Sequence, residues 1–183
     1  MPGETNKSRG GGVLDTIKKD IPSYQFNIDV NKREELWIHV ILNEIKIILG
    51  VVYFPPNSNL DIYIQHVNLV NNLVSHHSNS LICIIGVHNL PKLVRKSSVE
   101  CNNFIPFNIS SMAEEYLCDN FAFNGLLQFN DIGNDYNVIL DLVFCNDKTI
   151  TYKSVPLISE DIYHPALNVK ICDINLRLKK KYY

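Results

Sequence analysis

The stretch from Ser80 to Pro91, SLICIIGVHNLP, brings polar side chains to the end of a predicted buried strand. Residues Leu81–Ile85 are apolar and mostly β-branched, which predicts a central strand buried on both faces and closed by Gly86. The turn that follows carries His88, whose ring serves as acid, base or metal ligand, and Asn89, an amide donor and acceptor. Because a buried strand fixes the backbone while the next loop is free to carry chemistry, we expect a ligand site here.

Several strands and one helix must position this turn from the N-terminal side. Runs rich in Ile, Val and aromatic residues are separated by Asn43-Glu44, which favours a hairpin. Pro55-Pro56 ends the second run, and Ser58 is expected to cap a helix with apolar residues at helical spacing. The expected strands are Gly11–Ile17, Ser23–Val30, Glu35–Leu42 and Lys46–Tyr53, and the apolar helix positions are Leu60, Ile64, Val67, Val70 and Val74.

The C-terminal half repeats the pattern of one helix among strands. Ser111 and Glu114 form a capping box for a helix over Met112–Phe123, which Gly125 stops. Residues Lys92–Pro106 are expected to be irregular. The expected strands are Leu126–Phe129, Val138–Cys145, Ser154–Ile158 and Ala166–Ile174. About eight strands with two helices, not alternating one for one, favour two packed sheets flanked by helices.

Composition predicts a single domain. The chain has 183 residues, 46% of them hydrophobic and 20% charged, which suffices for one core. We expect a disordered segment over residues 1–9, a domain over 10–175 and a basic tail over 176–183. The net charge of -2 excludes a global basic field, so nucleic acid would need a local patch. Lys92, Arg95 and Lys96 form either a solvated loop or a phosphate-contacting one.

Cysteine usage and hydropathy predict an intracellular protein of the nucleus or cytoplasm. The five cysteines are widely spaced and mostly lie in apolar runs, which favours reduced core thiols. No spacing typical of a zinc site occurs. The N-terminus lacks the apolar core of a signal peptide, and the longest apolar run, Ile45–Phe54, is too short to span a bilayer. We therefore expect no membrane contact.

The motif IIGVHNLP resembles the IIGDFNLP-type motif of the endonuclease/exonuclease/phosphatase superfamily. The similarity is specifically to the AP-endonuclease-like domain that insect-type, jockey-like non-LTR retrotransposons carry ahead of their reverse transcriptase. Other blocks agree in the same order: SRGGGVLDTIKKDIPS (Ser8–Ser23), EELW (Glu34–Trp37), LGVVYFPPNS (Leu49–Ser58), NGLLQFN (Asn124–Asn130), LDLVF (Leu140–Phe144) and DIYHPALNV (Asp161–Val169). The resemblance implies a four-layer α/β/β/α sandwich, here incomplete at its N-terminus.

The resemblance also implies magnesium-dependent hydrolysis of DNA phosphodiesters and assigns roles to four residues. His164 matches the catalytic histidine, and Asp141 the aspartate that orients it. Asn89 and Tyr53 match donors to the phosphate. Taken alone, His164 is a surface histidine, Asp141 a strand aspartate with any nearby donor, Asn89 a turn residue and Tyr53 a core residue with its hydroxyl at the rim. The family motifs favour the catalytic interpretation.

The chain departs from the family at metal-binding positions. Val87 stands where the family keeps an aspartate, and the family's metal-binding glutamate has no counterpart before Ser8. Asp161 is either a metal ligand or the cap of its loop. His88 replaces an aromatic residue, and we interpret it as filling that slot rather than acting as a substitute acid. Magnesium binding is therefore weakened relative to the family.

Three hypotheses follow from this pattern. The first is a truncated retrotransposon endonuclease domain that has lost most metal-dependent DNA cleavage, with DNA and the reverse-transcriptase domain of the parent element as partners. The second is a working phosphodiesterase that uses Asp161, His88 or a partner's carboxylate. The third is a non-catalytic module that binds DNA or a protein through residues 92–96 and the basic tail.

Overall fold

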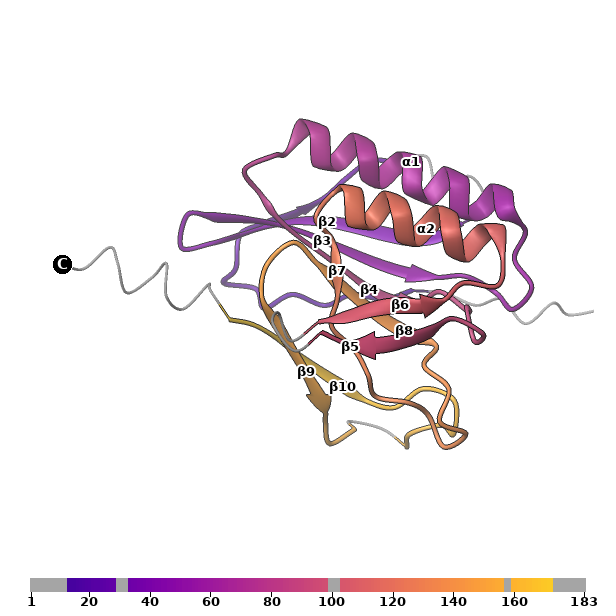
Figure 1. Ribbon diagram of the computed structural model, residues 1–183. Helices are drawn as coiled ribbons and strands as arrows, with labels where there is room; N and C mark the ends of the chain where they lie inside the picture. The colour runs from indigo at the N-terminus through magenta and orange to yellow at the C-terminus, as the bar shows by residue number, and fades with distance from the viewer. Residues whose placement is uncertain (1–12, 29–32, 99–102, 157–158, 173–183) are drawn as a thin grey trace, which may run out of the picture.

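The computed structural model describes residues 13–28, 33–98, 103–156 and 159–172. These residues form ten strands and two helices (Figure 1). The large sheet has eight strands in the order β1-β2-β3-β4-β8-β7-β6-β5, and the small sheet has two, β10-β9. Their bounds are β1 Ser23–Gln25, β2 Glu34–Leu42, β3 Ile45–Tyr53, β4 Leu81–Val87, β5 Val94–Ser97, β6 Phe104–Asn108, β7 Leu127–Gln128, β8 Asp141–Cys145, β9 Thr149–Lys153 and β10 Leu167–Ile171.

The predicted hairpin is confirmed as β2 and β3, joined at Asn43-Glu44. Both turn residues have positive φ, 49° and 69°, as a type I′ turn requires at its two central positions. Across the pair, Trp37 lies opposite Gly50, where an added Cβ would be 2.6 Å from the indole ring. Gly50 therefore makes the room that the Trp37 ring occupies.

Both helices cover one face of the large sheet (Figure 1). Helix α1 (Leu60–His76) is capped by Asn59 rather than Ser58, whose hydroxyl donates to the Pro55 carbonyl instead. Helix α2 (Met112–Phe123) begins with the predicted capping box of Ser111 and Glu114. No helix among the described residues is long and apolar enough to cross a membrane. The shared core on this face includes Trp37, Ile48, Val52, Val67, Ile84, Leu117, Phe121 and Phe144.

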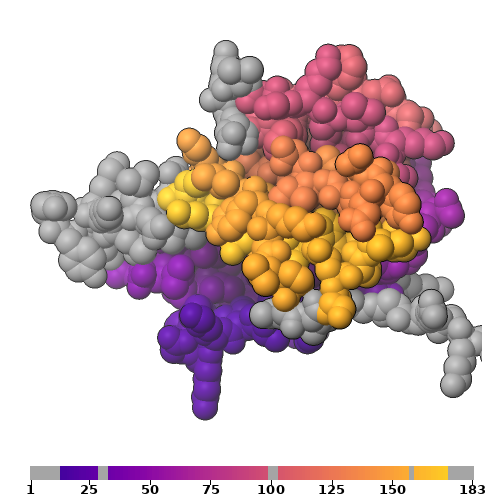
Figure 2. Space-filling model, turned by 90° about the horizontal axis from the view of Figure 1, so that it is seen from below, coloured from indigo at the N-terminus to yellow at the C-terminus, as the bar shows by residue number. Residues whose placement is uncertain are grey.

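The small sheet lies on the opposite face of the large one. Val169 and Ile171 of β10 pack with a second cluster that includes Ile47, Cys83 and Val143. Figure 2, seen from this side, shows the orange and yellow segments spread over the face. The two-sheet α/β fold is therefore confirmed. Within the described residues, helices flank only the large sheet.

Some predicted boundaries are wrong, and others lie outside the described residues. Residues 13–17 form no strand, and β1 has three residues, all exposed, in place of a strand over 23–30. The segment predicted as irregular contains the hairpin β5–β6, which is largely exposed and therefore lacks apolar periodicity. Residues 154–156 are not a strand; β9 precedes them and pairs with β10. The segments 1–9 and 176–183 fall outside the described residues.

A buried charged group ties β2 to α1. The carboxylate of Glu35 lies 2.9 Å from Arg33 Nε and 3.2 Å from His66 Nδ1, and it accepts from Trp37 Nε1 at 3.0 Å. Burial raises the pKa of Glu35, but the hydrogen bonds from His66 and Trp37 and the charges of His66 and Arg33 outweigh it, so the pKa is lowered. The carboxylate is therefore stabilised in its ionised form.

We expect Glu35→Gln to lower the free energy of unfolding by about 3 kcal/mol at neutral pH, because it removes the negative charge that compensates Arg33 and His66 in the interior. Since the pKa of Glu35 is lowered from 4.5, its contribution is present above that pH and is lost as pH falls through the lowered pKa. Urea unfolding at neutral and acid pH measures this. The difference in free energy of unfolding between wild type and variant should become smaller at acid pH.

The matched control is Glu115→Gln, on the exposed side of α2. It should change the free energy of unfolding by less than about 1 kcal/mol. Equal stability of Glu35→Gln and wild type at neutral pH would contradict the prediction.

Candidate active site

Four residues form a row across the end of the large sheet. Glu34 of β2 pairs with Tyr53 of β3, Tyr53 with Val87 of β4, and Val87 with Asp141 of β8. Directly paired residues point to the same face, and here it is the face of the small sheet, since Val52, Ile84 and Leu142 pack under the helices. The row gathers two carboxylates and a phenol, with Val87 between them.

The chain around Val87 is fixed by backbone contacts to both neighbouring strands. Gly86 has φ of +141°, and an added Cβ would lie 2.0 Å from the Val52 carbonyl oxygen, so only glycine fits there. His88 N donates to the Leu140 carbonyl at 3.2 Å. That bond makes Val87 and Asp141 a non-hydrogen-bonded pair, whose Cβ atoms are typically about 4.5–5.5 Å apart. The Val87 methyl groups therefore lie beside the Asp141 carboxylate.

His164 and Asp141, 23 residues apart in the chain, form a hydrogen-bonded pair. The distance from His164 Nδ1 to Asp141 Oδ2 is 3.0 Å, and the side chains are 36% and 17% exposed. Burial raises the pKa of Asp141; the hydrogen bond and charge of His164 oppose this and the charge of Asp161 adds to it, with a net increase. Because Nδ1 is engaged, Nε2 is the ring nitrogen left for a substrate.

Asp161 caps the loop that carries His164. Its Oδ1 accepts from the backbone N–H groups of Tyr163 at 2.6 Å and His164 at 2.9 Å. Of the two interpretations of Asp161, the loop cap is the contact present. A second positioning residue, Asn130, ends the NGLLQFN block, and the sequence assigns it no role of its own. It is fully buried, and its Nδ2 donates to the Asp141 carbonyl at 2.6 Å.

Asn89 joins the ends of β3 and β4. It has φ of 48°, and its Nδ2 donates to the Phe54 carbonyl at 2.6 Å. A cavity of about 310 Å³ opens beside it, lined largely by polar residues that include Lys92 and Ser111. Asn89 therefore lies at the same end of the sheet as Tyr53, which immediately precedes Phe54.

His88 belongs to the core. Its ring is fully buried, with edge contacts to Phe54, His66 and Phe144 at centroid distances of 5.4, 5.7 and 5.5 Å. Burial, with the nearby charge of His66, lowers the pKa of His88 to about 3. The ring is therefore neutral at physiological pH, as expected of a histidine that fills an aromatic slot.

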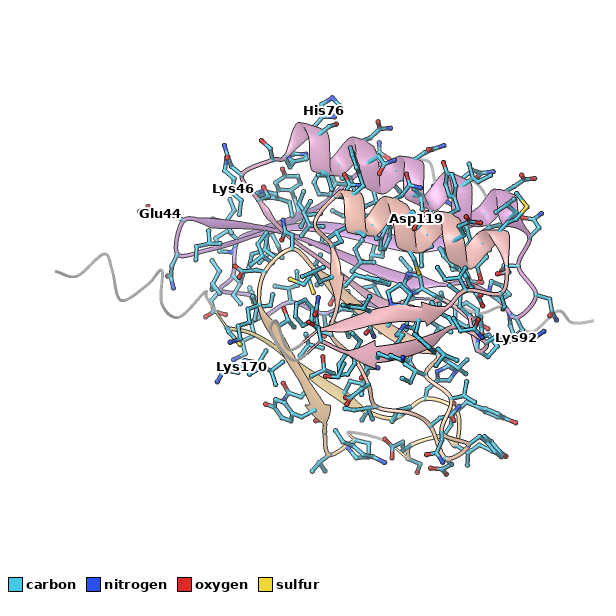
Figure 3. All side chains as sticks on the ribbon, in the orientation of Figure 1. Glu44, Lys46, His76, Lys92, Asp119 and Lys170 are labelled. Carbon is cyan, nitrogen blue, oxygen red and sulfur yellow. The ribbon has the colours of Figure 1, made fainter. Side chains whose placement is uncertain are left out.

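The three basic candidates do not form one patch. Arg95 and Lys96 are adjacent on β5 and so point to opposite faces. Arg95 Nη1 donates to the Leu93 carbonyl at 3.2 Å, and Lys96 Nζ lies 3.1 Å from the centroid of the Phe107 ring. Lys92 lies at the end of the molecule opposite the hairpin turn with Glu44 and Lys46 (Figure 3). Only Lys92 of the three lines the cavity beside Asn89.

The residues at the site do not fit a magnesium ion. Magnesium requires nearly octahedral oxygen ligands, and Val87 supplies none at the centre of the row. Asp141 and Asp161 each use one carboxylate oxygen in a protein hydrogen bond. Across the described ranges, no three side chains of His, Cys, Asp or Glu form a group that could hold a metal.

We expect Asn89→Gly and Asn89→Ala to separate two contributions of this residue. Both variants lose the hydrogen bond to Phe54, which costs about 1 kcal/mol. Alanine also pays about 1 kcal/mol or more for the left-handed backbone, which glycine adopts freely. Denaturant unfolding should therefore rank wild type above Asn89→Gly, and Asn89→Gly above Asn89→Ala. Alanine at least as stable as glycine would contradict the backbone argument.

Comparison with known proteins finds similarity in structure but not in sequence. No protein-family model matches the chain, and no curated protein matches it. The endonuclease domain of TRAS1, a telomere-specific non-LTR retrotransposon, aligns with a TM-score of 0.59 and 14% identity over 84% of this chain and 70% of that domain.

Two further solved structures align less well. A mannosyl-6-phosphatase of Bacteroides thetaiotaomicron gives a TM-score of 0.46 and 10% identity, over 83% of this chain and 65% of that one. A beta toxin variant of Staphylococcus aureus with bound magnesium ions gives 0.41 and 10%, over 77% and 55%. The chain thus spans less than two thirds of these two proteins. On the alignment with the TRAS1 domain, the chain has an α/β fold similar to that of this endonuclease domain.

Proposed function

We propose that this chain is a retrotransposon-type endonuclease domain whose hydrolysis of DNA phosphodiesters is impaired by Val87. The observation that carries the proposal is the His164–Asp141 pair, 3.0 Å apart at the end of the sheet and next to Val87. DNA is the proposed partner. A reverse-transcriptase domain of the parent element is the proposed neighbour.

The residues present supply part of the chemistry of phosphodiester hydrolysis. Asp141 accepts the Nδ1–H of His164 and so fixes the tautomer in which Nε2 takes a proton from water or, once protonated, gives it to the leaving oxygen. The hydroxyl of Tyr53 and the second N–H of Asn89 Nδ2 are the proposed donors to phosphoryl oxygens. The first N–H of that amide is bonded to Phe54.

Val87 removes a carboxylate from the centre of this arrangement. An aspartate there would supply a charge and a proton acceptor directly beside Asp141. The loss of one positioned charged group typically costs a few kcal/mol of transition-state stabilisation, and about 1.4 kcal/mol corresponds to a tenfold change in rate. Since the site does not fit magnesium, the proposed activity is slow.

A non-catalytic binding module on the same fold is the second candidate. Val87 and the incomplete set of metal ligands favour it, because both remove chemistry without removing the fold. Binding of DNA through lysine and arginine side chains would weaken as the salt concentration rises and would be unaffected by a metal chelator. The two candidates therefore differ in whether DNA is cut.

We expect Val87→Asp to nick supercoiled DNA at least about tenfold faster than wild type in magnesium, because it restores the positioned carboxylate. Agarose gel analysis of the nicked form measures the rate. The matched control is Val87→Asn, which has the shape of aspartate without its charge and should stay at the wild-type rate. His164→Ala in the Val87→Asp background should abolish the gain. No difference between Val87→Asp and Val87→Asn would contradict the proposal.

A further inference from the structure

Two tyrosine rings from different loops lie together, and one of them belongs to the residue that precedes His164. Tyr136 comes from the loop between β7 and β8, and Tyr163 from the loop between β9 and β10. Their ring centroids are 5.8 Å apart with planes inclined by 31°. The two residues are 61% and 51% exposed. Rings that are this exposed to solvent gain little free energy from burial, so packing in the core does not explain their position.

The loop under Tyr136 is fixed by one buried side chain. Asn134 is 8% exposed, and its Oδ1 accepts from the backbone N–H groups of Tyr136 at 2.9 Å and Val138 at 3.1 Å. Asn137, with φ of 58°, donates from its backbone to the Asn134 carbonyl at 2.8 Å. The backbone beneath the Tyr136 ring is therefore held although the ring itself is exposed.

The second loop is held in the same way and is joined to the first. The Asp161 cap bonds the backbone N–H groups of both Tyr163 and His164, so this ring and the imidazole share one support. Asp135 N donates to the Ile162 carbonyl at 3.3 Å, which links the two loops. The corresponding orange and yellow segments lie side by side in Figure 2. The exposed ring pair and the candidate catalytic histidine are thus held by one connected set of backbone hydrogen bonds.

We propose that Tyr136 and Tyr163 form a stacking platform for an unpaired nucleobase next to the phosphate that His164 meets. This inference rests on the proposed function and adds the form of its substrate. Aromatic rings stack any base, since every base has a π-face. Tyr163 directly precedes His164, so a strand with a phosphate at the imidazole has its neighbouring base within reach of the rings.

The charges around the platform favour a base over a phosphate as its ligand. Asp135 and Asp161 belong to the two loops, and the nearby Glu160 carboxylate lies 3.5 Å from Lys153 Nζ. Carboxylates repel phosphates, whereas an uncharged base is not opposed. In a duplex the base faces are covered by their neighbours, so the ligand is a base in a single strand or one turned out of the helix.

The test measures oligonucleotide binding in the presence of a metal chelator, so that no metal-dependent cleavage occurs. The salt concentration is about 150 mM, which screens the charges of the carboxylates. One probe is a single-stranded oligonucleotide with 2-aminopurine, whose fluorescence falls on stacking. The other is an oligonucleotide of equal length with abasic sites, which has the same phosphates without the bases. Wild type should bind the first about tenfold more tightly. Tyr136→Ala should lose that preference.

Two matched variants separate stacking from other effects. Tyr136→Phe keeps the ring and should keep the preference, and so should Tyr152→Ala, which removes a tyrosine of β9 that is 47% exposed and outside the platform. Where Tyr136→Ala does not fold, Tyr163→Ala takes its place. Equal binding of the two oligonucleotides by wild type overturns the proposal. The proposal is also overturned if the protein binds an oligolysine peptide instead of DNA and this binding depends on the Tyr136 ring. Such a cationic peptide is the ligand that the nearby carboxylates would favour.

Failure of the platform and failure of the nuclease proposal give different results. A preference for bases that depends on Tyr136, with no nicking by any variant, supports the platform and rejects hydrolysis. Nicking by Val87→Asp without a preference for bases supports hydrolysis and overturns the platform.

Discussion

The close approach of Gly86 to the backbone of Val52 is the constraint on which the site depends. A side chain at position 86 would meet the Val52 carbonyl oxygen, so β3 and β4 stay paired to their ends only because this residue is glycine. Their continued pairing puts Tyr53 beside Val87, and the antiparallel neighbour β8 then brings Asp141 to the other side. Because Gly86 has no Cβ, β3, β4 and β8 can place Tyr53, Val87 and Asp141 side by side in one row.

The sequence predicted those parts of the fold that local chemistry specifies. The β2–β3 turn and the capping box of α2 depend on a few adjacent residues, and both are confirmed. The exposed hairpin β5–β6 has no buried face, so it lacks the alternation from which a strand is recognised. The extent of β1 is over-predicted for the opposite reason: Phe26 and Ile28 are half-buried beyond its end, but the last bond to β2 is from Phe26 N to the Trp37 carbonyl, and Ile28 N donates to the Phe26 carbonyl instead.

The same distinction applies to the site. Motif resemblance selected Asp141 and His164, and the hydrogen bond between them is present, although nothing in the spacing of the two residues implies it. Asn130 and Asn134 were not selected, because their side chains bond backbone groups that only the folded loops bring together. Tyr136 was not selected either, because its ring meets that of Tyr163 only in the folded protein. Glu34 was missed as a member of the row, since its place depends on the register of β2 with β3.

Val87 also has a consequence for stability. Two ionised carboxylates at about 5 Å repel each other by about 3 kcal/mol at an effective dielectric constant of 20, so an aspartate at position 87 beside Asp141 is unfavourable without a cation. Asp161 already adds to the pKa increase of Asp141. Valine relieves that repulsion and leaves the paired strands undisturbed. A site without a bound metal is therefore more stable with valine than with the catalytic acid, and the substitution that impairs the proposed chemistry favours the fold that carries it.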